Sequence, residues 1–150
     1  FSDLCYRNGM LFSPRVYREH VLRYHQRFAE LCHEHDMFMI LHCDGDVAEF
    51  IPLLIEAGFD CVQPLEARAG NDVRRYKPLY GDRISFFGNT DMDVLARGDR
   101  DEITHEVATK VEAAKGGGGY IWHSDHSVPP TVSYADYCYW MDLAREWGEY

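Results

Sequence analysis

Four short apolar runs of this 150-residue chain each end in a group of chemically active side chains. The polar groups that follow these runs are His42-Cys43-Asp44-Gly45, Gln63-Pro64-Leu65-Glu66, Gly88-Asn89-Thr90-Asp91 and His123-Ser124-Asp125-His126. In parallel α/β proteins, catalytic and ligand-binding residues come from the carboxyl ends of strands. If the four runs are strands, we expect the four polar groups to form one side of a single active site.

His42 and Asp44 predict a metal site at the first of these strand ends. Side chains alternate between the two faces of a strand, so Ile40, His42 and Asp44 share one face while Leu41 and Cys43 take the other. A neutral imidazole and a carboxylate are suitable ligands for zinc or another first-row metal. The alternative is a hydrogen-bonded His–Asp pair without a metal. Because alternation points Cys43 away from this face, we do not expect it to act as a nucleophile.

The last strand end carries two imidazoles that flank a carboxylate, in His123, Asp125 and His126. His126 would complete a set of metal ligands with His42 and Asp44. The same group could act as acid and base near neutral pH. The double proline that follows stiffens the chain, which suits a site that must keep its geometry. The alternative is an exposed polar loop.

Two carboxylates and two amides at the middle strand ends are further candidates. Glu66 and Asp91 could supply another metal ligand or act as general acid or base. Gln63 and Asn89 could hydrogen-bond a carboxylate or an amide of a substrate. Each of the four could equally cap a turn or the helix that follows.

The apolar runs alternate with helical patterns, which predicts four β-then-α units behind one leading helix. We expect strands at 37–41, 59–62, 84–87 and 119–122, and helices at 13–35, 47–57, 72–80, 99–115 and 133–147. Connections of this length imply parallel neighbouring strands and right-handed crossovers. Two folds fit, an independent open sheet and the last four units of a (β/α)8 barrel, which needs about 250 residues. The missing initiator Met and the lack of a Gly-rich phosphate loop after the first strand favour the partial barrel.

Composition narrows the class of protein and its partners. The formal net charge of −10 disfavours nucleic acid and membranes as partners, because nucleic acid and anionic lipid need a surface rich in Lys and Arg. The sequence has no transmembrane run and no signal peptide. Its five cysteines are odd in number and form no CxxC motif, which argues against a disulfide framework. We therefore expect a single cytoplasmic domain over residues 1–150.

Short segments spread over nearly the whole chain are specific for one superfamily when taken together. They are Asp3-Leu-Cys-Tyr-Arg-Asn-Gly9, Leu11-Phe-Ser-Pro14, Leu41-His-Cys-Asp-Gly45, Ile51-Pro-Leu-Leu-Ile-Glu-Ala-Gly58, Tyr80-Gly-Asp-Arg83, Phe87-Gly-Asn-Thr-Asp91, Gly117-Gly-Gly-Tyr120 and His123-Ser-Asp-His-Ser-Val-Pro129. On these segments the chain resembles the carboxyl-terminal half of the uroporphyrinogen decarboxylase superfamily, which also contains cobalamin-dependent methyltransferases. The resemblance implies a (β/α)8 barrel whose amino-terminal half is absent from this chain.

The methyltransferase branch of the superfamily implies a zinc site and transfer of a methyl group involving a corrinoid or a thiol. That branch binds zinc through a His-x-Cys pair and a later Cys. His42 matches the first ligand, Asp44 stands where the paired Cys would be, and His126 falls near the later Cys. Two imidazoles and a carboxylate form a harder ligand set than thiolates, compatible with zinc, iron or manganese.

The decarboxylase branch implies a metal-free decarboxylation of a tetrapyrrole in porphyrin biosynthesis. His126-Ser127 looks like its His–Gly pair near the last strand, with His126 as proton donor or product binder. Tyr6 lies near the position of its serine, and this mismatch counts against true uroporphyrinogen decarboxylation. A third hypothesis is a protein that binds a corrinoid or tetrapyrrole without turnover.

The first hypothesis is a metal-assisted, methyltransferase-like enzyme with a divalent metal, zinc in the first place. The predicted metal ligands are His42, Asp44 and His126, the predicted catalytic residues are His126, Asp125 and Glu66, and the predicted substrate-binding residues are Gln63, Asn89, Asp91 and His123. The expected partners are a small-molecule, tetrapyrrole or corrinoid substrate and a corrinoid protein. A second copy that closes the barrel as a homodimer is a further expectation, because four barrel strands alone leave two sheet edges unpaired.

Overall fold

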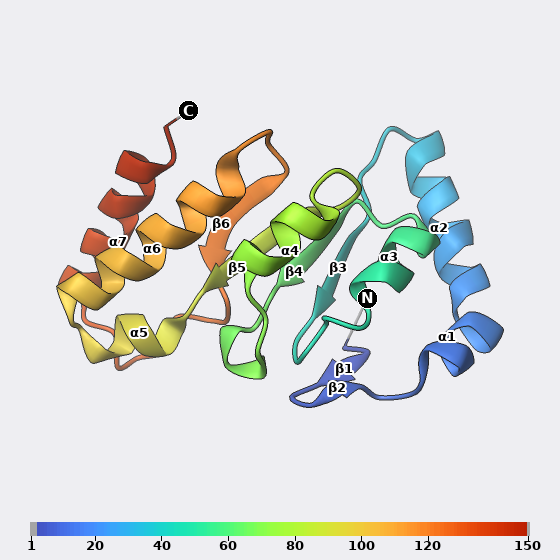
Figure 1. The fold of residues 1–150 in the computed structure, drawn as a ribbon, viewed down its shortest axis with the longest axis horizontal. Coiled ribbons are helices and arrows are strands. Elements are labelled where there is room, and N and C mark those ends of the chain that lie inside the picture. The colour runs from blue at the N-terminus through green and yellow to red at the C-terminus, as the bar shows by residue number, and fades with distance from the viewer. Residues whose placement is uncertain (1–2, 150) are drawn as a thin grey trace.

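A parallel four-stranded sheet forms the centre of the fold in the computed structural model, which describes residues 3–149. Its strands are β3 (Ile40–Cys43), β4 (Cys61–Pro64), β5 (Ser85–Thr90) and β6 (Tyr120–Ser124). They are hydrogen-bonded in chain order, β3-β4-β5-β6, and all pairs are parallel. This sequential order with a helical connection after each strand is that of a partial (β/α)8 barrel (Figure 1).

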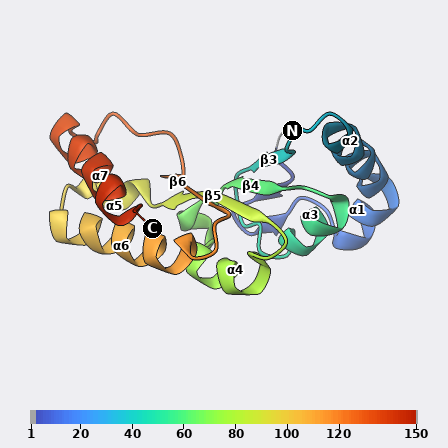
Figure 2. The same cartoon turned by 90° about the horizontal axis from the view of Figure 1, so that it is seen from above.

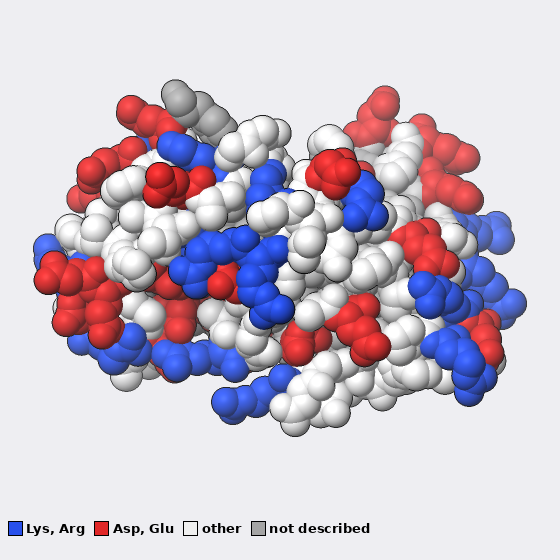
Figure 3. Space-filling model, in the orientation of Figure 1, with Lys and Arg blue, Asp and Glu red and all other residues white. Residues whose placement is uncertain are grey.

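Two helices precede the sheet, and at least one helix follows each of its strands. The helices are α1 (Pro14–His20), α2 (Leu22–Glu34), α3 (Ile51–Ala57), α4 (Val73–Tyr80), α5 (Met92–Arg97), α6 (Arg100–Lys115) and α7 (Tyr134–Trp147), with a short 3-10 turn, η1, at Ala67–Ala69. Figure 2 shows α3, α4 and α6 side by side along the same face. On the outer side of these helices, Lys and Arg gather over α4, with acidic side chains among them (Figure 3). No helix within residues 3–149 is both long and apolar enough to cross a membrane.

The two faces of the sheet differ in burial. Leu41, Val62 and Phe86 point toward the helices and are fully buried. Burial of each such side chain contributes about 1.5–3 kcal/mol to stability. Ile40 and Ile121 lie on the opposite face and are each 45% exposed. This face corresponds to the inside of a barrel, and it carries the candidate site.

The expected strand segments and helices form, but the leading helix and the helix after β3 differ from their expected bounds. The leading helix is divided at Val21, which ends α1 and precedes α2. Residues eight apart lie about 12 Å apart along a straight helix. The break lets the Tyr17 hydroxyl reach Nδ1 of His25 at 2.8 Å in the core. The next helix begins at Ile51 rather than at residue 47, with Pro52 in its first turn, where a missing N–H costs nothing.

All four strands continue past the carboxyl ends of their apolar runs. His42 pairs with Gln63 across β3 and β4, and Asn89 pairs with His123 across β5 and β6. Strand pairing uses backbone groups, so polar side chains at a carboxyl end remain part of the ladder. The switch from apolar to polar residues therefore marks the start of the candidate site inside each strand rather than the end of the strand.

A short antiparallel hairpin lies next to the carboxyl end of β3 (Figure 1). It consists of β1 (Cys5–Tyr6) and β2 (Gly9–Met10), and its apolar pattern was too short to predict. The Leu4 N–H donates to Sγ of Cys43 at 3.4 Å, and the Asp46 N–H donates to the Tyr6 carbonyl at 3.0 Å. These bonds fix the segment around the hairpin against the loop that follows β3.

Candidate metal and active site

The carboxyl ends of β3, β4 and β6 open onto one cavity of about 520 Å³. Its lining includes His42, Asp44, Gln63, His123, Ser124 and His126. Five of these six residues were among the candidates from the sequence. Asn89 and Asp91, the residues predicted at the end of β5, do not line this cavity. Three of the four polar groups therefore meet at one cavity, as the sequence indicated.

His42, Asp44 and Asp3 form the centre of the cluster. The Nε2 atom of His42 lies 3.7 Å from Oδ2 of Asp44 and 3.9 Å from Oδ1 of Asp3. One ligand atom from each of the three residues lies within 4.8 Å of the other two. The ligands of a tetrahedral zinc ion are separated by about 3.4 Å, given bonds of about 2.0–2.1 Å. The three side chains therefore need only a small inward movement to share one ion.

Asp44 supplies a further sign that a cation fits here. Its Oδ1 atom is buried and has no hydrogen-bond partner in the described part of the chain. An unpartnered buried acceptor costs about 1–3 kcal/mol, and more when it is charged. A divalent cation between the two carboxylates would compensate that cost, so the donor set of one imidazole and two carboxylates fits such an ion.

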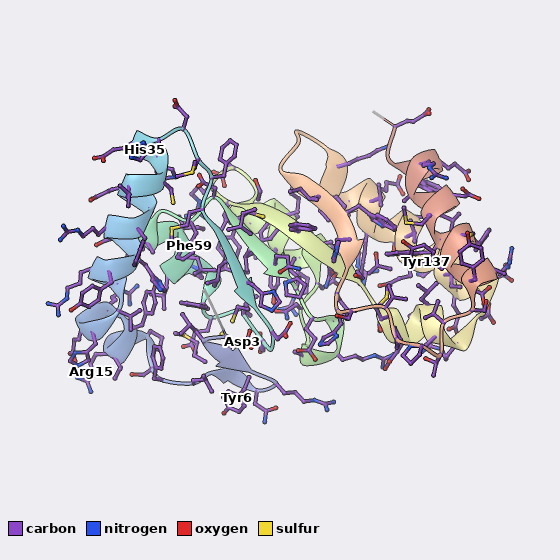
Figure 4. All side chains as sticks on the ribbon, turned by 180° about the vertical axis from the view of Figure 1, so that it is seen from behind. Asp3, Tyr6, Arg15, His35, Phe59 and Tyr137 are labelled. Carbon is purple, nitrogen blue, oxygen red and sulfur yellow. The ribbon has the colours of Figure 1, made fainter. Side chains whose placement is uncertain are left out.

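Asp3 is the member of this cluster that the sequence analysis did not include among the candidate ligands. Its Oδ1 accepts the backbone N–H of Asp44 at 2.9 Å, which places it beside the end of β3 (Figure 4). The hairpin can approach so closely because Gly45 has no side chain: a Cβ there would overlap the Tyr6 backbone. Asp3 lies 41 residues from Asp44 in sequence and in no strand-end group, so no spacing rule singles it out. The glycine directly after Asp44, Gly45, was the available signal of a close backbone approach.

The two imidazoles of the last strand end border the same cavity from the opposite side. Nδ1 of His123 lies 2.7 Å from the Ser124 carbonyl, so Nδ1 carries the proton and Nε2 is the basic nitrogen. The ring packs edge-on against Phe87, with 4.9 Å between the ring centroids. His126 is exposed and lies outside the three-residue cluster, so the structure places Asp3 where the sequence suggested His126.

Asp125 and Glu66 hold loops rather than face the main cavity. Asp125 is buried and accepts the N–H groups of Ala67 at 2.9 Å and Met92 at 3.0 Å. Burial raises the pKa of the Asp125 carboxyl above its ordinary value. Oε2 of Glu66 accepts the N–H of Gly45 at 2.9 Å and so holds the loop that carries Asp44. Both side chains border a smaller space of about 150 Å³ beside His126.

Asn89 and Asp91, which the sequence predicts as substrate-binding residues, make local hydrogen bonds and do not line the main cavity, although Asp91 borders the smaller space beside His126. Asn89 is fully buried. Its side chain accepts the N–H of Val73 at 2.9 Å and donates to the Leu65 carbonyl at 2.6 Å, so it cannot reach the cavity. Asp91 caps α5 by accepting the N–H of Asp93, and it pairs with Arg68 at 3.0 Å. In both cases the capping alternative describes the geometry.

Comparison with known proteins adds a family and a fold. The family model described as uroporphyrinogen decarboxylase (URO-D) matches residues 2–147. A solved methyltransferase from Methanosarcina mazei superimposes with a TM-score of 0.75 at 19% sequence identity. The match covers 99% of this chain and 42% of that chain, so this chain spans less than half of that protein's length. No curated protein matches the chain.

Proposed function

Because the chain belongs to the uroporphyrinogen decarboxylase family, we propose that it forms part of a metal-assisted, methyltransferase-like enzyme. The observation that carries this proposal is the cluster of Asp3, His42 and Asp44 at the edge of a cavity that also contains two further imidazoles. The likeness of the fold to a methyltransferase supports the same branch of the family.

Asp3, His42 and Asp44 would hold a divalent ion, with zinc as the first candidate and manganese or iron compatible with the same donors. Such an ion, when bound, supplies Lewis acidity that lowers the pKa of a nucleophile. Glu66 keeps the Asp44 loop in place through its bond to Gly45. Asp125 keeps the neighbouring loops in place through Ala67 and Met92.

His123 and His126 would move protons during the reaction. The basic Nε2 of His123 is available to a substrate because its Nδ1–H is used by the Ser124 carbonyl. Imidazoles exchange protons near neutral pH, which suits deprotonation of a thiol or another methyl acceptor. The proposed methyl donor is a corrinoid, carried by a corrinoid protein.

Decarboxylation of a tetrapyrrole is the second candidate, and the description of the matching family model favours it. A substrate with several carboxylates requires cationic side chains for binding. Within residues 3–149, the side chains that line the main cavity include histidines but no Arg or Lys. Decarboxylation would therefore require cationic side chains from another part of the protein, whereas the proposed metal ligands lie within this chain.

Metal analysis and turnover of the full-length protein test the proposal. We expect the wild type to bind one equivalent of metal and to transfer a methyl group from methylcobalamin to a thiol. We expect His42→Ala and the double variant Asp3→Asn/Asp44→Asn to lose the metal, and their rate of methyl transfer to fall as a result. His105→Ala, an exposed histidine on α6, is the matched control and should retain both. A metal-free wild type together with unchanged turnover in His42→Ala would refute the proposal. Turnover of a porphyrinogen instead would establish the second candidate, and binding of the corrinoid without turnover would establish a binding protein.

A further inference from the structure

The side chain of Gln63 contacts the histidine of the candidate metal cluster. Oε1 of Gln63 lies 2.6 Å from Nδ1 of His42. The two residues are partners in the β3–β4 register, so their side chains leave the sheet side by side on the same face. An amide oxygen only accepts hydrogen bonds, so Nδ1 of His42 carries the proton. In a neutral imidazole this leaves the lone pair on Nε2, which faces Asp3 and Asp44.

The opposite orientation of the Gln63 amide leaves a proton without a partner. If the amide nitrogen faced His42 and donated to Nδ1, the proton of the neutral imidazole would be on Nε2. That atom lies 3.9 Å from the Asp3 carboxylate and 3.7 Å from the Asp44 carboxylate, and both distances exceed hydrogen-bond range. The orientation with Oε1 toward His42 therefore satisfies the ring and presents a bare nitrogen to the carboxylates.

The backbone holds this contact firmly. Leu41 and Cys43 on either side of His42 are fully buried, and Val62 beside Gln63 is also fully buried. The next strand approaches β4 so closely at Gly88 that a Cβ there would overlap the carbonyl of Pro64. With both backbones fixed, His42 and Gln63 have little freedom to move apart.

We infer that Gln63 is a positioning residue, which fixes the tautomer of His42 so that Nε2 is the metal-binding nitrogen. This inference rests on the proposed function, and it replaces the sequence-based prediction that Gln63 binds substrate. A metal-bound histidine usually donates its second N–H to a partner that fixes the ring and raises its basicity. Removal of such a partner weakens metal binding by about 10–100-fold.

Two substitutions of Gln63 and one matched control test the inference in the full-length protein. Gln63→Leu removes the acceptor at similar size, and Gln63→Glu replaces it with a stronger one. Gln26→Leu is the control, because Gln26 also makes one hydrogen bond, to the Glu56 carbonyl, but lies on α2. We expect zinc affinity to fall about 10–100-fold in Gln63→Leu, to be kept or raised in Gln63→Glu, and to be unchanged in Gln26→Leu.

A second measurement reads the proton directly and does not depend on metal. Long-range ¹H–¹⁵N spectra of the metal-free protein at about pH 8, above the ordinary imidazole pKa, distinguish Nδ1–H from Nε2–H. His42→Ala identifies the signal. We expect Nδ1–H in the wild type and in Gln63→Glu, and a mixture of both forms in Gln63→Leu.

The outcomes separate this inference from the proposed function. If the wild type binds zinc and Gln63→Leu binds it equally well, the positioning role is refuted while the metal site stands. An Nε2–H signal in the wild type refutes it as well. If neither the wild type nor any variant binds zinc, the proposed function fails. The spectra alone then decide whether Gln63 determines which ring nitrogen of His42 carries the proton. Circular dichroism of each variant confirms that the fold is retained.

Discussion

Replacement of Asp125 by alanine tests how the loops around the cavity are held together. The buried Asp125 carboxylate follows β6 and accepts one N–H from the loop after β4, at Ala67, and one from the start of α5 after β5, at Met92. A single side chain therefore ties three strand ends together. In Asp125→Ala both N–H groups lose their acceptor.

The magnitude follows from these two bonds and from the cost of a buried charge. An unsatisfied buried N–H costs about 1–3 kcal/mol, so two would cost at most about 2–6 kcal/mol, and the only partly buried Ala67 N–H places the sum in the lower part of that range. The raised pKa of Asp125 shows that burial disfavours its ionised form, and alanine removes this cost at neutral pH. We therefore expect Asp125→Ala to lower the free energy of unfolding by about 2–4 kcal/mol at pH 7.

The raised pKa of Asp125 determines how the cost of Asp125→Ala changes with pH. The folded protein holds the proton of Asp125 more tightly than the unfolded chain, whose carboxyl titrates near 3.8. The stability that this proton contributes is fully present below 3.8 and is lost as the pH rises through the raised pKa. The loss caused by Asp125→Ala should therefore be larger near pH 4 than at pH 7.

Denaturant unfolding of the full-length protein, followed by circular dichroism at both pH values, measures this difference. Asp142→Ala is the control, because the Asp142 side chain is 70% exposed and makes a surface ion pair with Arg145. Asp142→Ala should change the free energy of unfolding by no more than about 0.5 kcal/mol. The reasoning fails if Asp125→Ala costs no more than the control, or if its cost grows as the pH rises.

Two further predictions concern the core. Burial lowers the pKa of His25 below its ordinary value of 6.5, so the stability that neutral His25 provides is lost as the pH falls below 6.5 toward the folded pKa. Thermal melts between pH 7 and 5 should show this loss in the wild type and a shallower one in His25→Gln. Gly88→Ala should cost more than about 4 kcal/mol, because its Cβ would overlap the Pro64 carbonyl. Gly117→Ala meets only open space and should cost about 1–2 kcal/mol for its left-handed backbone, so equal losses in the two glycine variants would contradict the steric account.

The helices were predictable where local chemistry marks their ends. Asp99 accepts the N–H groups of Asp101 and Glu102 and caps α6, at the residue where the sequence analysis expects this helix to begin. Ser133 accepts the N–H of Asp136 and begins α7. Both predictions are confirmed because a capping side chain acts within a few residues of itself. The division at Val21 could not be predicted, since no capping side chain marks it and the bond that accompanies it joins two buried residues in different helices.

The site was predictable in its position but not in the role of each residue. The carboxyl ends of parallel strands meet at one edge, which is why His42, Gln63 and His123 line the same cavity. Polarity at a strand end does not distinguish a side chain that faces a cavity from one that bonds the backbone. Asn89 bonds to the backbone, and Asp3 lies just before the β1–β2 hairpin, far from Asp44 in sequence, so both required coordinates.

The polar residues of this edge thus divide into two groups with separable effects. Asp125 and Asn89 are buried, and their bonds go to the backbone, so their substitution should lower stability first and binding only as a consequence. The His42 side chain is 51% exposed, and within residues 3–149 its short hydrogen bond is to Gln63, so its substitution should leave stability nearly unchanged. A loss of metal or turnover in a fully folded His42→Ala protein would therefore report on chemistry at the cavity. The same loss in Asp125→Ala would report only on the loops that shape it.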